Sequence, residues 1–118
     1  MAKSLKRNEK KGTAQTAVME ETGKSFGVRQ VRGGVVFRAF CPEAANVQIA
    51  GDFNSWQPEK TKMKRVSTNG VWEVKLPLTA GTYRYRLVVD GQWQKDPYND
   101  DCEPNPYGEF NSIVKVSF

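Results

Sequence analysis

The 118-residue chain contains no histidine and only two cysteines, and both shortages limit the chemistry open to it. Without histidine, the sequence excludes histidine-based acid–base catalysis and metal sites that need an imidazole ligand. Cys41 and Cys102 make one possible pair, but without a secretory signal we expect two thiols rather than a disulfide. The sequence has no Gly-rich phosphate loop of the Walker type and no cluster of metal ligands, so no cofactor is expected.

Long apolar runs are missing as well. No segment has the length and hydrophobicity of a membrane span, and the first residues lack the apolar region of a secretory signal, so we expect a cytoplasmic protein. More than half of the net charge of +5 comes from residues 1–27, which hold six basic and three acidic side chains. We predict that this segment is a disordered, solvated tail, and a basic arm for RNA, DNA or a membrane is the less favoured alternative.

From residue 28 onward, short runs rich in Val, Phe, Tyr and Trp alternate with Gly, Pro, Asn and Asp, which is typical of an all-β domain. In residues 83–89 every second side chain is Tyr, Leu or Val, which places Arg86 on the opposite, outward face. Asp90-Gly91 is a hairpin-turn dipeptide. The pattern predicts a two-sheet sandwich of seven to eight strands over residues 28–118. Strands are expected at 34–40, 45–51, 61–66, 71–76, 83–89, 92–95 and 112–118.

Three aromatic side chains fall in segments with loop chemistry: Trp56, Trp93 and Tyr107. Trp72, by contrast, alternates with apolar neighbours and is expected in the core. Each loop aromatic alone also fits a lid folded back on the core. Together, flanked by Asn, Asp or Gln, they favour a ligand with both C–H and hydroxyl surfaces, such as a pyranose ring. Nucleobases also stack on aromatic rings and are the competing ligand class.

Three segments make the chain similar to a known family: IAGDFNSW (49–56), YRYRLVVDGQWQKDP (83–97) and FNSIVKV (110–116). They resemble the glycogen-binding domain of the β subunit of AMP-activated protein kinase. They equally resemble the family 48 carbohydrate-binding modules at the N-termini of isoamylases and glycogen branching enzymes. The resemblance covers roughly residues 28–118 and implies an immunoglobulin-like, early-set β-sandwich that binds α-1,4-linked glucans.

The resemblance also implies roles for individual residues. Trp56 and Trp93 match the two tryptophans that grip the sugar chain in the family. Arg86 matches a basic residue that hydrogen-bonds sugar hydroxyls, and its outward position follows independently from the strand alternation. These three residues are therefore the leading candidates for contact with a glucan.

Three further candidates follow from the same comparison and from the loop chemistry. Tyr107 matches an apolar loop residue that inserts into the glucan helix, and Asn111 matches an asparagine just before the last strand. Asn54, a polar neighbour of Trp56, is the third candidate for carbohydrate binding. Glu109 stands where the kinase domain has a threonine, so that contact departs from the family pattern.

We expect no catalysis by this chain. An amylase-type hydrolase needs a barrel of about 250 residues, and Asp100 and Asp101 are loop neighbours rather than the opposed carboxylates of a glycosidase. The leading hypothesis is a non-catalytic module for glycogen, starch or malto-oligosaccharides, with a glycogen-metabolism enzyme or another protein as a candidate partner. A protein-interaction domain with weak or lost sugar binding is the alternative. A nucleic-acid binder ranks third and is not expected.

Overall fold

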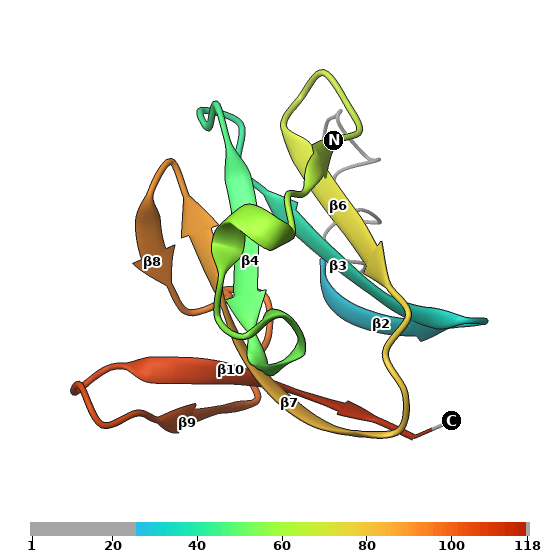
Figure 1. Ribbon diagram of the computed structural model, residues 1–118. Helices are drawn as coiled ribbons and strands as arrows, with labels where there is room; N and C mark the ends of the chain where they lie inside the picture. The colour runs from blue at the N-terminus through green and yellow to red at the C-terminus, as the bar shows by residue number, and fades with distance from the viewer. Residues whose placement is uncertain (1–25, 118) are drawn as a thin grey trace, which may run out of the picture.

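The computed structural model describes residues 26–117, which form two antiparallel β-sheets packed face to face (Figure 1). The first sheet contains β4 (Val47–Gly51), β7 (Gly81–Val89), β8 (Gln92–Gln94), β9 (Cys102–Pro104) and β10 (Phe110–Val116). The second sheet contains β2 (Gly27–Val31), β3 (Gly34–Phe40), β5 (Lys64–Arg65) and β6 (Val71–Leu76). Their strand orders are β4-β7-β10-β9, with β8 also on β7, and β2-β3-β6-β5. The predicted all-β, immunoglobulin-like sandwich is confirmed.

The core lies between the two sheets and comes from the alternating positions of their strands. Phe37 of β3 meets Tyr85 of β7 edge to face, with the ring centroids 5.0 Å apart. Trp72 of β6 is buried, and its indole Nε1 donates to the Cys41 carbonyl oxygen at 3.0 Å. The expectation that Trp72 packs in the core is confirmed, and the indole N–H has the partner that burial demands.

Strand β7 is the centre of the first sheet and has β4 along one edge. Its other edge is shared end to end by two strands: β10 pairs with residues 81–85 and β8 with residues 87–89. Arg86 therefore lies at the junction between β8 and β10. The Asp90-Gly91 turn that leads into β8 has φ angles of 49° and 83°, both in the left-handed region that a two-residue hairpin requires.

A buried polar network holds the chain where it leaves β8. Asp96 is only 2% exposed, and its Oδ2 accepts from the Tyr85 hydroxyl at 2.6 Å. Its Oδ1 accepts from the Tyr98 backbone N–H at 2.9 Å, and its own N–H donates to Ser112 Oγ at 2.9 Å. Asn99 Nδ2 donates to both the Tyr85 hydroxyl oxygen and the Ile113 carbonyl oxygen. These bonds connect the segment after β8 to β7 and β10.

The described part of the chain has nine strands, where seven to eight were predicted. The two that no sequence pattern predicted are β2 and β9. Strand β2 has the sequence GVRQV, which carries little apolar signal because it lies at the edge of its sheet and pairs only with β3. Strand β9 has only three residues and contains Pro104. The strand expected at 61–66 shortens to β5, while Lys62 forms a single bridge with Gln48 of β4. Within residues 26–117, no helix has the length and hydrophobicity needed to cross a membrane.

The predicted tail, residues 1–27, lies outside the described residues except for its last two. Phe26 is buried, and its ring centroid lies 6.0 Å from that of Phe40 and 4.9 Å from that of Tyr98. Gly27 begins β2. The packed region therefore includes these two residues, and the disorder of the rest of the tail stays a prediction.

Candidate functional site

Trp56 is held by a tight loop that follows β4. The loop contains a 3-10 helix, Asp52–Asn54, after which Ser55 and Trp56 both adopt positive φ angles, 58° and 59°. The Trp56 backbone N–H donates to the Gly51 carbonyl oxygen at 2.9 Å, and its indole Nε1 donates to Asp52 Oδ1 at 3.0 Å. Asp52 Oδ2 in turn accepts from the Arg84 backbone N–H of β7 at 2.8 Å. The indole is thus oriented through Asp52 by the sheet itself.

Asn54 has a different position from the one expected of a sugar contact. Its Oδ1 accepts from the Gly51 backbone N–H at 3.0 Å. Its Nδ2 donates to the Ile49 carbonyl oxygen and to Thr61 Oγ1, both at 2.9 Å. The Asn54 amide therefore bonds within the loop, and it is not among the side chains that line the pocket described below.

Trp93 lies on the outer face of the first sheet. It pairs directly with Val88 across the β7–β8 hairpin, so its side chain is on the same face as Arg86. The indole is 44% exposed. The short hairpin therefore presents a large ring to solvent from a rigid strand rather than from a free loop.

Tyr107 is at the tip of the β9–β10 hairpin, and it is 88% exposed. Asn105 organises this tip: its Oδ1 accepts from the backbone N–H groups of Tyr107 and Glu109, at 2.9 and 3.0 Å. Its backbone N–H donates to the Glu109 carbonyl oxygen at 2.8 Å, and its Nδ2 donates to Asn111 Oδ1 at 3.3 Å. Sequence reasoning missed Asn105, although an Asn side chain in a loop often accepts from the backbone N–H two residues on, as it does here.

Arg86 forms the floor between these aromatic groups and is mostly buried, with 13% of its side chain exposed. Its Nη2 lies 2.7 Å from Oε1 of Glu109, which comes from the Tyr107 loop. The predicted outward direction of Arg86 agrees with this geometry. The ion pair between strand β7 and the hairpin tip was not predicted, because sequence alone does not place residues 86 and 109 together.

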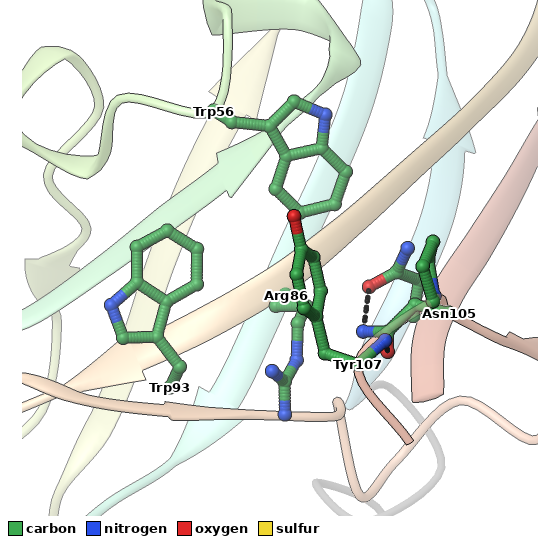
Figure 2. Close-up of a pocket in the computed structure, with 7 residues that line it drawn as sticks. Trp56, Arg86, Trp93, Asn105 and Tyr107 are labelled. Carbon is green, nitrogen blue, oxygen red and sulfur yellow. Dashed lines mark hydrogen bonds between the residues drawn. The ribbon is translucent and has the colours of Figure 1, made fainter. Parts of the chain in front are cut away.

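Five of the six predicted site residues meet around one pocket of about 420 Å³. Figure 2 shows the Trp56 and Trp93 rings and the Tyr107 phenol around the opening, with Arg86 behind them. The lining is Trp56, Arg86, Trp93, Asn105, Pro106, Tyr107 and Asn111. This volume is in the range of small-molecule sites, and three aromatic rings with one guanidinium and two amides suit a ligand that has both stacking faces and hydroxyl groups.

The pocket lining differs from the active site of a glycosidase. Among the described residues, the pocket lining contains no carboxylate, and no group of three acidic or cysteine side chains is placed to hold a metal ion. Asp100 and Asp101 are exposed and lie outside the pocket lining. Glycosidic hydrolysis uses two opposed carboxyl groups at the scissile bond, and the described lining does not present such a pair.

Comparison with known proteins agrees with the geometry. Residues 25–104 match the model of carbohydrate-binding module 48, the isoamylase N-terminal domain. The chain belongs to this family. The family 48 match confirms the resemblance drawn from the sequence motifs, and it contains Trp56, Arg86 and Trp93. It ends before Tyr107 and Asn111, which therefore rest on the structure and on the motif resemblance.

Several curated proteins resemble this family 48 module, and each is named 1,4-alpha-glucan branching enzyme GlgB. The protein of Corynebacterium jeikeium is 33% identical over 92 residues, which is 74% of this chain and 13% of that protein. The protein of Synechococcus elongatus is 46% identical over 78 residues, 62% of this chain and 10% of that protein. The protein of Bacillus subtilis is 35% identical over 80 residues, 64% and 13% respectively. The chain thus spans only about an eighth or less of the length of these relatives.

Proposed function

We propose that this family 48 module is a non-catalytic binding domain for α-1,4-linked glucans such as glycogen, starch and malto-oligosaccharides. The observation that carries the proposal is the convergence of Trp56, Trp93 and Tyr107 on one pocket from three separate segments of the chain. Apolar area that stays exposed to water forgoes about 25 cal/mol per Å² of favourable burial free energy. A cluster of exposed aromatic rings on a folded surface is therefore a mark of a ligand that covers it.

The pocket offers both kinds of contact that a glucose unit needs. The axial C–H groups of a pyranose ring stack on an indole or phenol face, whose negative quadrupole attracts them. The equatorial hydroxyls then lie at the ring edge, where Asn111 presents an amide NH2 group and Arg86 presents guanidinium N–H groups. A chain with successive glucose units uses more than one of the three rings at once.

We expect modest affinity for an oligosaccharide, with a Kd on the order of 10 μM to 1 mM, or about −4 to −7 kcal/mol. The stacking gain has to exceed the desolvation of many hydroxyl groups and the loss of freedom of the bound chain. The charge pattern argues against nucleic acid as the ligand. Among the described residues, Arg86 is the single cation that lines the pocket, and it is already paired with Glu109, whereas nucleic-acid sites use several unpaired cations.

The role implies partners and a location that stay proposals. A glycogen-metabolism enzyme is the protein partner we propose, since the relatives named branching enzymes contain a similar segment within a much longer chain. We also propose a cytoplasmic location. A protein-interaction domain with weak or lost sugar binding is the second candidate, and the exposed Phe110 on the same hairpin is the apolar feature that favours it.

Co-sedimentation with glycogen tests the proposal. Trp56→Ala and Trp93→Ala should each weaken binding by about 1–3 kcal/mol, by analogy with stacked bases, which is about 5- to 150-fold in Kd. Phe110→Ala is the matched control, because Phe110 is about as exposed as Trp93 and does not line the pocket. Retention of glycogen binding by both tryptophan variants, or equal loss in the control, contradicts the assignment.

A further inference from the structure

One contact at the pocket belongs to neither the aromatic rings nor the amides. Glu109 Oε1 lies 2.7 Å from Arg86 Nη2. The carboxylate is more than half exposed and is not among the residues that line the pocket, whereas Arg86 is. Glu109 therefore influences the pocket through its ion pair with Arg86.

The location of the Glu109 carboxylate is set by the hairpin tip. The Glu109 backbone N–H donates to Asn105 Oδ1 at 3.0 Å, and the Glu109 carbonyl oxygen accepts from the Asn105 N–H at 2.8 Å. The same Asn105 oxygen accepts from the Tyr107 N–H. The ion pair with Arg86 thus attaches the Tyr107 loop to strand β7, and the two partners come from separate, internally bonded segments.

Little solvent reaches the positive charge of Arg86, so Glu109 compensates that charge more than it would compensate an exposed guanidinium. Only 13% of its side chain is exposed, and its buried Nε has no hydrogen-bond partner within residues 26–117. A poorly hydrated charge that loses its counter-charge becomes an uncompensated site and attracts any anion that can reach it. The pocket beside Arg86 is the opening through which such an anion would arrive.

We propose that Glu109 sets the charge selectivity of this pocket: by neutralising Arg86 it makes the site favour uncharged glucans over glucans that carry phosphate esters. The inference rests on the proposed function and adds to it a discrimination between two classes of glucan. Without Glu109, Arg86 is a free cation beside the stacking rings, and a phosphate on the sugar gains a charge-assisted hydrogen bond there. With Glu109 in place, the phosphate meets a carboxylate beside Arg86, which is the one cation that lines the pocket among residues 26–117.

The test compares β-cyclodextrin with a β-cyclodextrin that carries one phosphate ester, by titration calorimetry at low ionic strength. For the wild type, the phosphate-bearing ring should bind no more tightly than the neutral ring. In Glu109→Gln, the ratio of phosphorylated-ring to neutral-ring affinity should rise about tenfold, and the gain should shrink as salt is added. The gain should be absent when Arg86→Gln is combined with Glu109→Gln.

Glu103→Gln is the matched control. It removes one negative charge from the same sheet face, where Glu103 pairs with Arg84, but it leaves Arg86 and Glu109 untouched. Its affinity ratio should stay within about twofold of the wild type. An equal rise in this control, an unchanged ratio in Glu109→Gln, or tighter binding of the phosphorylated ring by the wild type overturns the inference alone. A wild type that binds no neutral ring overturns the proposed function and the inference together.

Discussion

Tyr85→Phe removes a single hydroxyl from the buried network that connects β7 to the segment after β8. In the structure this hydroxyl donates to Asp96 Oδ2 at 2.6 Å and accepts from Asn99 Nδ2 at 3.1 Å. The variant leaves the Asp96 carboxylate with the Tyr98 N–H as its remaining donor, while Asn99 keeps the Ile113 carbonyl oxygen. Shape is conserved, so the change isolates the hydrogen bonds.

The expected loss of unfolding free energy is about 2–4 kcal/mol at neutral pH. The bond from Tyr85 to the Asp96 carboxylate, a hydrogen bond to a charged group, contributes about 1.5–3 kcal/mol. The bond from Asn99 to the Tyr85 hydroxyl contributes part of the usual value of about 0.5–1.5 kcal/mol, because Asn99 keeps one acceptor without it. For a domain whose total stability is on the order of 5–15 kcal/mol, a loss of this size is readily measured.

The loss should depend on pH, because burial raises the pKa of Asp96 above its ordinary value, against the opposing effect of the Tyr85 and Tyr98 hydrogen bonds. When the folded pKa exceeds the unfolded one, the unfolded chain releases its proton first as pH rises. The contribution of Asp96 to the free energy of unfolding therefore decreases as pH rises from the ordinary pKa of 3.8 to the folded pKa. Above the folded pKa it is constant. Tyr85→Phe removes a donor to the charged form and raises the folded pKa further, so it should destabilise more at pH 7 than at pH 3.

Urea unfolding followed by tryptophan emission at pH 7 and pH 3 measures both quantities. Tyr83→Phe is the matched control on the same strand, since the Tyr83 hydroxyl donates to the Thr79 carbonyl oxygen at an exposed site. It should lose under about 1 kcal/mol with no change between the two pH values. A Tyr85→Phe loss equal to that of the control, or one that is the same at both pH values, refutes this account of the network.

Two further substitutions test the loop that holds Trp56. Asn54→Ala should lower the free energy of unfolding by about 1–3 kcal/mol in urea, because the Asn54 amide makes three hydrogen bonds that hold the loop; an unchanged midpoint would count against this. Asp52→Ala should weaken β-cyclodextrin binding several-fold in a fluorescence titration, because it releases the Trp56 indole. Wild-type affinity in this variant would show that Trp56 needs no such support.

Much of the architecture follows from local patterns. Strict alternation in residues 83–89 predicted both the central strand and the outward direction of Arg86, and the left-handed angles of Asp90 and Gly91 agree with the hairpin expected there. The loop aromatics were recognised because indole and phenol rings occur in segments whose other residues favour turns. The motif resemblance supplied what these patterns do not, namely that the rings belong to one site.

Other features depend on contacts between distant residues, which no local pattern contains. Strand β9 has three residues and forms only because β10 offers an edge. Asn54 has the same side chain as a sugar-binding amide, but its donors and acceptors are used by β4 and Thr61 once the loop closes. Glu109 reaches Arg86 only through the hairpin tip that Asn105 organises. The sequence shows the type of each residue but not which distant residue it bonds to.

The three tryptophans allow a direct measurement of the central claim. Each indole N–H gives its own nitrogen–proton NMR signal, and the structure assigns Trp56 and Trp93 to the pocket and Trp72 to the core. Titration with β-cyclodextrin to several times the expected Kd should move the Trp56 and Trp93 signals along one binding curve while the Trp72 signal stays in place. If the Trp56 and Trp93 signals do not move, or if Trp72 alone responds, the pocket is not a glucan site.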